Sequence, residues 1–326
     1  MGTRLEDPRR DRRILRHNVV SARVETCSSV ERTAATPDIR RLFRRDIVAL
    51  IAAFSVGGCA DGILDPHGPI AADEKTILFN SLGIMLAIVI PTILATLGVA
   101  FWFRASNARA RYMPDFQYSG LLEMIVWSIP AMTVLLLGSL CWVGAHDLDP
   151  PKPIASAVKP LTVQVVSLDW KWLFIYPEQG IASVNTLTIP AATPISFELT
   201  SSGVMNSFFV PQLAGQIYTM GAMTTRLQLL ADTPGTYEGR SANFSGNGFS
   251  DMHFFVHAVP PDQFTAWVAQ TRGVGPALDQ ESYDALAMPS QAVSPFTYGS
   301  VSAGLFGTLV SGAMHSDAPF CSASGD

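Results

Sequence analysis

Two long uncharged stretches dominate the pattern of apolar and polar positions along the chain. No charged residue lies between Lys75 and Arg104, and a second uncharged stretch follows Glu123 and ends at Asp147. Each stretch is long enough to cross a hydrocarbon core about 30 Å thick at about 1.5 Å per residue. A pair of buried helices in a large soluble protein is the alternative, but both stretches exceed ordinary soluble helices and are apolar on every side. The pattern therefore predicts a transmembrane helical hairpin over residues 77–146.

The charges that flank the two stretches predict the orientation of this hairpin. The connecting segment carries Arg104, Arg109 and Arg111 against the single acid Asp115, whereas the outer flanks are acidic. Basic residues are retained on the cytoplasmic side of a membrane. We therefore expect the connecting segment in the cytoplasm and both outer ends on the opposite side.

After the hairpin, the pattern changes to short alternating strands. A stiff, proline-rich linker is expected over residues 147–160. Strand candidates then recur at roughly 8–12 residue spacing, which is typical of an antiparallel β-sandwich. They cover residues 162–177, 185–190, 194–201, 206–211, 224–231, 235–243 and 252–259. The sandwich is thus expected over 161–260, a helical C-terminal region with helices at 261–272 and 279–287 over 261–315, and a disordered tail over 316–326.

The first 58 residues have the pattern of a targeting leader. Residues 1–46 are rich in arginine, contain no lysine and show no apolar periodicity. A short apolar stretch and two glycines follow, and this order indicates a secretory signal. Cys59 comes directly after the glycines, which resembles the lipobox of bacterial lipoproteins and makes Cys59 a candidate for lipid attachment. An ordinary cleaved signal and an uncleaved third helix are the alternatives, and residues 59–76 are expected to form a periplasmic segment.

Composition supports a membrane protein. The chain has 326 residues, of which 48% are hydrophobic and 15% are charged; about a quarter is usual for the charged share of a soluble protein. The net charge of −5 gives no indication of nucleic-acid binding. The four cysteines are not spaced for a zinc site, a redox motif or a disulfide framework.

Several long motifs carry a resemblance to a known family. The strings VSLDWKWLFIYPE, MNSFFVPQLAGQIYTM and ANFSGNGFSDM resemble subunit II of the haem–copper respiratory oxidases, and most closely the cytochrome bo-type ubiquinol oxidase branch. The strings LDPHG, RASNARARY, VWSIP and PEQGIASVN extend the resemblance from about Cys59 to the second C-terminal helix. It implies a two-helix transmembrane hairpin followed by an antiparallel cupredoxin-like β-sandwich and a short helical C-terminal region.

The resemblance also points to a metal site whose ligands are replaced. In cytochrome c oxidases, subunit II holds a dinuclear copper centre with two histidines, two cysteines, a methionine and a glutamate carbonyl. A copper pair needs such thiolate and imidazole ligands, whereas serine hydroxyls do not ionise at neutral pH and phenylalanine has no donor. We therefore expect no metal at this site and no cofactor bound by this chain. The corresponding positions are Asn206, Ser241, Asn243, Ser245, Phe249 and Met252, and only Met252 keeps its ligand type.

Two other groups of residues invite a functional interpretation. His253 and His257 lie four apart in a predicted strand, hence about 13 Å apart, and cannot share one ion. Aromatic residues alternate with other residues along an earlier strand. In copper-bearing subunits, tryptophans at the corresponding positions lie on the route by which electrons enter. Without copper, core packing and contact with subunit I explain the run better, and a remnant of a docking surface is the alternative. The run consists of Trp170, Trp172, Phe174 and Tyr176.

The function implied by the resemblance is that of subunit II in a proton-pumping terminal ubiquinol oxidase. Subunit I would hold two haems and one copper, subunits III and IV would complete the complex, and membrane lipid would surround the hairpin. The location would be the bacterial inner membrane, with the C-terminal domain in the periplasm. A membrane-anchored, copper-free binding module acting alone is one alternative. A copper-carrying cytochrome c oxidase subunit is another, and the substituted ligands argue against it.

Glu123 has two interpretations. A carboxylate in the first turn of a helix is favoured by the helix dipole. In haem–copper oxidases, a subunit II glutamate just before a VW-x-x-P string lies at the mouth of a proton channel into subunit I, and Glu123 matches it in LLEMIVWSIP. The resemblance therefore makes Glu123 a candidate for proton entry.

Overall fold

The computed structural model describes residues 62–111 and 113–313 of the chain. The predicted leader, the candidate lipidation residue Cys59 and the predicted tail lie outside the described residues. What the sequence predicts for them stays a prediction.

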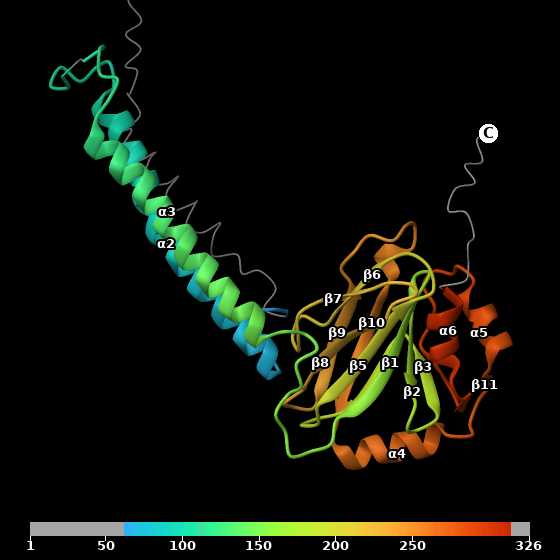
Figure 1. The fold of residues 1–326 in the computed structure, drawn as a ribbon. Coiled ribbons are helices and arrows are strands. Elements are labelled where there is room, and N and C mark those ends of the chain that lie inside the picture. The colour runs from blue at the N-terminus through green and yellow to red at the C-terminus, as the bar shows by residue number, and fades with distance from the viewer. Residues whose placement is uncertain (1–61, 112, 314–326) are drawn as a thin grey trace, which may run out of the picture. The chain divides into compact units, whose positions relative to one another are not determined.

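Two long apolar helices, α2 (Pro69–Trp102) and α3 (Gly120–Asp147), run side by side (Figure 1). Pro69 starts α2 after an extended Gly68, and proline suits the first helical position because its missing N–H would be unpaired there anyway. The helix thus begins before the uncharged stretch itself. Both helices are long and apolar enough to cross a membrane, as the sequence predicts.

A seam of small and aliphatic residues joins α2 to α3. Its members are partly buried and recur every three or four residues, which places them on one face of each helix. An added Cβ on Gly144 would lie 2.8 Å from Cδ1 of Ile77, so the helices approach closely at this level. Small residues permit such an approach between membrane helices. The seam consists of Ile77, Ser81, Ile84 and Ile88 on α2 and of Thr133, Leu137, Leu140 and Gly144 on α3.

Residues 161–259, together with one later strand, form two packed sheets (Figure 1). Their strands are short, and proline, glycine or serine residues lie in most of the turns between them, as the sequence pattern predicts. The first sheet has the order β12-β3-β2-β1-β5-β8, with β1 Leu161–Leu168, β2 Lys171–Tyr176, β3 Ile181–Val184, β5 Ile195–Ser201, β8 Thr225–Leu229 and β12 Phe296–Tyr298. The second has the order β4-β10-β9-β6-β7, with β4 Thr186–Pro190, β6 Asn206–Phe209, β7 Ile217–Thr219, β9 Gly235–Ser241 and β10 His253–Val259.

The sandwich is mixed, which refines the predicted antiparallel arrangement. Most strand pairs are antiparallel, but β1 pairs with β5 and β10 pairs with β4 in parallel. Alternation of apolar and polar residues reports which face a side chain takes and not the direction of the neighbouring strand. The sequence pattern therefore predicts the sandwich without distinguishing these two pairs.

The first sheet is buried on both faces. One cluster of apolar side chains fills the space between the two sheets and includes Trp172, Phe174, Phe208 and Phe254. A second cluster lies on the other face of the first sheet, where Leu168 and Leu173 meet side chains of the C-terminal region. Burial on both faces explains why β2 reads as an almost continuous apolar run in the sequence.

Residues 278–310 of the C-terminal region cover that outer face (Figure 1), whereas Phe264 and Trp267 of its first helix pack against the core between the sheets. Its helices α4 and α5 match the two helices expected from the sequence, whereas its short strands are not predicted. One of them, β12, extends the first sheet by pairing antiparallel with β3. The remaining elements are α4 Pro261–Thr271, β11 Ala277–Leu278, α5 Gln280–Ala287, β13 Ser300–Val301 and α6 Leu305–Ala313.

The segment just before α2 is bound to the sandwich. The backbone N–H of His67 donates to Gln212 O over 2.8 Å, and the N–H of Asp232 donates to His67 O over 2.9 Å. Ile70, in the first turn of α2, packs against the core between the sheets. A Cβ on Gly68 would overlap the carbonyl oxygen of Leu230, so only glycine fits there without displacing backbone.

Candidate functional site

The positions that the resemblance assigns to copper ligands meet at one end of the second sheet. Asn206 is the first residue of β6, and Ser241 is the last residue of β9, which pairs with β6. The loop between β9 and β10 supplies the other positions and contains a short 3-10 turn at Phe249–Asp251. The structure thus brings residues from two strands and one loop to a single place.

Four buried polar side chains at this place bond to one another. Ser241 Oγ donates to Asn206 Oδ1 over 3.2 Å, and Asn206 Nδ2 donates to Ser167 Oγ over 3.4 Å and to Val204 O over 3.2 Å. The hydroxyls of Ser167 and Thr219 lie 2.9 Å apart. We call Ser167, Asn206, Thr219 and Ser241 the serine–asparagine cluster. Its polar groups have partners within the protein, as buried polar groups require.

The rest of the loop packs around Trp170. Its indole N–H donates to Ser245 O over 3.1 Å, and a Cβ on Gly248 would lie 2.5 Å from the indole ring. Ser245 Oγ lies 3.9 Å from the sulfur of Met252, and Asn243 Nδ2 donates to the backbone oxygen of Met205 over 3.0 Å. Phe249 packs edge-on against Phe244, with the ring centroids 5.6 Å apart. Protein–protein contacts therefore hold this loop in shape.

These residues do not fit a dinuclear copper centre. The hydroxyls of Ser241 and Ser245, the amide of Asn206 and the ring of Phe249 replace the thiolates and imidazoles that copper prefers, and only the thioether of Met252 remains. The amide and hydroxyls also bond to each other, so a metal ion would have to break the serine–asparagine cluster to reach them. We therefore derive no electron-transfer step through this position.

Three members of the predicted aromatic run lie in the core. Trp172 and Phe174 are fully buried and contact Phe254, with ring centroids 5.6 Å and 5.2 Å away. Tyr176 is also fully buried; its hydroxyl donates to Thr188 O over 2.9 Å, and burial raises its pKa. Trp170 differs, because it occupies the turn between β1 and β2 with φ at 65° and is partly exposed.

His253 and His257 project from the same face of β10 but contact different neighbours. The His257 ring lies 3.1 Å from the hydroxyl of Thr236 on the adjacent strand. The His253 ring contacts Phe255, with the ring centroids 6.2 Å apart. Neither histidine lies in the serine–asparagine cluster.

Glu123 lies in the first turn of α3 and is exposed in the isolated chain. Its backbone N–H donates to Ser119 O over 3.0 Å, so the residue belongs to the start of the helix. The exposed carboxylate is free to face a neighbouring subunit or water.

A buried lysine is the polar feature that sequence reasoning missed. Lys171 on β2 is only 1% exposed, and its ammonium donates to Met288 O over 2.7 Å and to Ser290 Oγ over 2.5 Å. Burial lowers the pKa of this ammonium, and the nearby Asp169 opposes that shift. In the sequence, the one indication of this buried lysine is its position between Trp170 and Trp172 in a predicted strand. Lys171 ties the sandwich to the C-terminal region.

Comparisons with known proteins agree with one another. A family profile described as the COX Aromatic Rich Motif matches residues 273–316. The cytochrome bo(3) ubiquinol oxidase subunit 2 of Pseudomonas aeruginosa is 45% identical over 82% of this chain and 81% of its own length. The ubiquinol oxidase subunit 2 of Acetobacter aceti is 48% identical over 80% and 85% of the two chains. The quinol oxidase subunit 2 of Bacillus subtilis is 37% identical over 78% and 80%.

Proposed function

We propose that this chain, which belongs to the ubiquinol oxidase subunit 2 family, is the subunit without a redox centre in a proton-pumping terminal oxidase that transfers electrons from ubiquinol to oxygen. The serine–asparagine cluster is the observation that supports a subunit without a redox centre. By the resemblance, its members Ser241 and Asn206 stand where copper-carrying subunits have a thiolate and an imidazole, and all four members are already bonded within the cluster. Electrons would therefore reach oxygen entirely through another subunit.

The partner is subunit I, which would hold two haems and one copper, with subunits III and IV completing the assembly. The exposed apolar faces of α2 and α3 would contact subunit I and lipid. The arginines of the connecting segment favour its placement in the cytoplasm, so the sandwich would be periplasmic on the bacterial inner membrane. The chain would help the complex to assemble and would cover the periplasmic face of subunit I.

Co-purification tests this function. The tagged full chain, extracted from membranes in mild detergent, should bring down a haem-bearing membrane subunit and quinol-dependent oxygen uptake. Deleting the chain should abolish that uptake, and its return should restore it. Isolation of the chain alone, with uptake unaffected by its deletion, would favour a free-standing binding module. Copper bound to the chain itself would instead favour a copper-carrying oxidase subunit.

We further propose that Glu123 takes up protons from the cytoplasm for subunit I. Its place in the first turn of α3 and its exposed carboxylate support this role, together with the arginines of the connecting segment, which favour a cytoplasmic location for this end of the hairpin. Glu123→Ala should slow oxygen uptake in a complex with normal haem content and assembly. Asp115→Asn, which removes an acid from the connecting segment, is the matched control and should leave turnover unchanged. Equal turnover of the Glu123 variant and wild type would leave this residue with a purely local role at the helix start.

The chain is also proposed to be a lipoprotein cut before Cys59. Intact-mass measurement should then give a chain that begins at Cys59 and carries acyl groups. Cys59→Ser should remove that mass, yet the protein should stay in the membrane because a transmembrane helix anchors more strongly than acyl chains. An unmodified N-terminus at another residue would disprove the acylation.

A further inference from the structure

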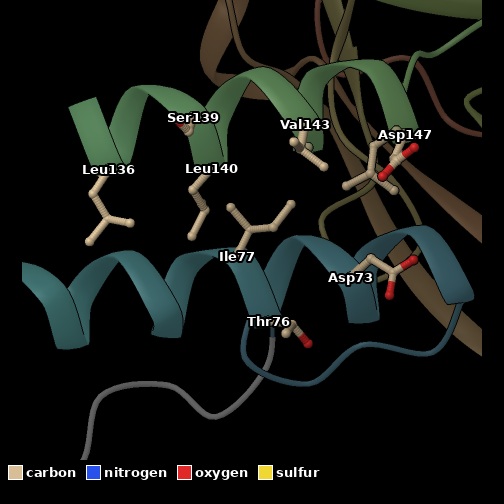
Figure 2. Close-up of a pocket in the computed structure, with 10 residues that line it drawn as sticks. Asp73, Thr76, Ile77, Leu136, Ser139, Leu140, Val143 and Asp147 are labelled. Carbon is tan, nitrogen blue, oxygen red and sulfur yellow. The ribbon is translucent and has the colours of Figure 1, made fainter. Parts of the chain in front are cut away.

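A cavity of about 580 Å³ opens between α2 and α3 where α2 begins and α3 ends (Figure 2). Its volume falls in the range typical of ligand pockets, roughly 300–1,000 Å³. The lining changes character along its length. Asp73 and Asp147 lie at the end nearer the sandwich linker, and Leu136 and Leu140 lie deeper along α3.

Three apolar side chains of this cavity face one another across the gap between the helices. In Figure 2, Leu136 and Leu140 point from α3 toward α2, and Ile77 points back toward α3. Gly144 also lines the cavity and touches Ile77, so the helices are in contact beside it. The apolar part of the lining therefore includes three seam residues, Ile77, Leu140 and Gly144.

The length of the cavity matches one leaflet of a membrane. Asp147 and Leu136 are both on α3 and lie about 16 Å apart along the axis at about 1.5 Å per residue. Half of a hydrocarbon core about 30 Å thick is about 15 Å. When the carboxylates lie at the depth of the lipid headgroups, the leucines reach the middle of the bilayer.

The charges in the cavity select among lipid headgroups. Two carboxylates and no cation belong to its lining. Asp147 has a neighbour outside the lining, since Lys152 Nζ lies 3.7 Å from its carboxylate, but both side chains are more than half exposed. Such exposed pairs contribute little. Among the described residues, no ion pair involves Asp73.

We propose that this cavity binds a phospholipid with a primary ammonium headgroup. The ammonium would donate hydrogen bonds to Asp73 and Asp147, and one acyl chain would lie along Ile77, Leu140 and Leu136. A purely anionic headgroup would bring its phosphate toward two carboxylates, with no cation in the lining and only the exposed Lys152 beside Asp147 to compensate. A neutral quinol could donate hydroxyl groups to the same carboxylates but would gain no charge attraction. This inference requires only that the hairpin spans a membrane.

The test uses the full chain, purified from membranes with its assembled partners and depleted of lipid. Photoreactive phosphatidylethanolamine and photoreactive phosphatidylglycerol are added separately, and cross-linked peptides are mapped by mass spectrometry. We expect phosphatidylethanolamine to label peptides of both α2 and α3 around the cavity, with roughly tenfold less labelling by phosphatidylglycerol. A tenfold ratio corresponds to the loss of about one charge-assisted hydrogen bond.

Matched variants separate charge from shape. Asp73→Asn combined with Asp147→Asn should bring the ratio of phosphatidylethanolamine to phosphatidylglycerol labelling close to one. Asp149→Asn removes an acid outside the lining and should leave that ratio unchanged. Ser139→Phe should fill the cavity and stop labelling by either lipid. Gly138→Phe adds the same ring to α3 outside the lining and should leave labelling intact. Oxygen uptake and thermal unfolding confirm that each variant is assembled.

Three results would overturn the proposal. Equal labelling by both lipids in the wild type would show that the carboxylates do not select a headgroup. Protection of the cavity peptides by a helix of another subunit, with no lipid labelling, would assign the cavity to a protein contact. Displacement of the lipid by added ubiquinone, with quinone recovered in solvent extracts, would assign it to a quinone.

Discussion

Gly239 on β9 lies opposite Phe254 on β10, and the ring of Phe254 covers its backbone. Phe254 is fully buried and stacks on Phe208 with the ring centroids 5.1 Å apart. A methyl group on residue 239 would overlap that ring. Because the interior is close-packed, the ring could move only by disturbing its aromatic neighbours.

Gly239→Ala is therefore expected to destabilise the folded chain by about 1–3 kcal/mol, as overpacking usually does. Denaturant unfolding of the purified chain, followed by tryptophan fluorescence, measures the loss. Gly307→Ala is the control, because a Cβ on Gly307 in α6 would meet nothing within 4 Å. Equal stability of the two variants would show that the Phe254 ring can shift freely.

Only part of the serine–asparagine cluster can be identified from the sequence. The resemblance identifies Asn206 and Ser241 as positions that lack copper-binding donors. It does not reveal Ser167 and Thr219, which come from other strands and complete the hydrogen bonds. Partners that a fold brings together from separate strands have no common spacing in the sequence, so only the structure can name them.

Among the elements, α5 is held at its start by one exposed carboxylate. Asp279 Oδ1 accepts the backbone N–H of Ser282 over 2.9 Å, and this bond lowers the pKa of Asp279. A lowered pKa means that the carboxylate stabilises the fold above its ordinary pKa of about 3.9. That contribution is lost as the pH falls toward the folded-state pKa.

The acid dependence of α5 can be isolated with two substitutions. Asp279→Asn keeps a good N-cap acceptor without a titrating group, so its thermal unfolding midpoint should change less between pH 7 and pH 3 than that of wild type. Asp279→Ala should lower the midpoint already at pH 7. Identical pH profiles for wild type and Asp279→Asn would contradict this assignment.

The pairing of α2 with α3 depends on the missing side chain at Gly144. A Cβ there would lie 2.8 Å from Cδ1 at the end of the Ile77 side chain, which could turn away from one methyl group but less easily from the three carbons of a valine side chain. Gly144→Val should therefore separate the helices and destabilise the hairpin by about 1–3 kcal/mol. Gly138→Val is the control on the same helix, because a Cβ there would have nothing within 4 Å. Cysteine cross-linking between α2 and α3, made in both backgrounds, measures the separation.

At the scale of the whole molecule, long periodic elements were predictable and short ones were not. The two helices and the longer strands follow from uncharged runs and alternation. The run over residues 162–177 reads as one stretch, but it reverses at Trp170, which adopts a left-handed φ without glycine. The strands β3, β7 and β12 contain four, three and three residues, too few to show a period.

The attachment of residues 67–70 to the sandwich links the apolar helical hairpin to the sandwich domain. Gly68→Ala should push the segment away from Leu230 and break the backbone bonds that His67 makes with Gln212 and Asp232. We expect faster amide exchange in residues 66–72 and 230–234, which contain the donors His67 and Asp232, measured by mass spectrometry. Gly83→Ala in the middle of α2, where a Cβ would meet nothing within 4 Å, should leave that exchange unchanged.

The pairing of β12 with β3 has a consequence for how the protein is made. More than a hundred residues separate Val184 from its partner Phe296. At bacterial synthesis rates of about 5–20 residues per second, β3 waits on the order of ten seconds for that partner to emerge. Throughout this interval the nascent domain carries an open sheet edge, which is a template for unwanted pairing. A chaperone that binds the emerging chain would therefore be most useful if it shielded the open edge of β3 until β12 is available.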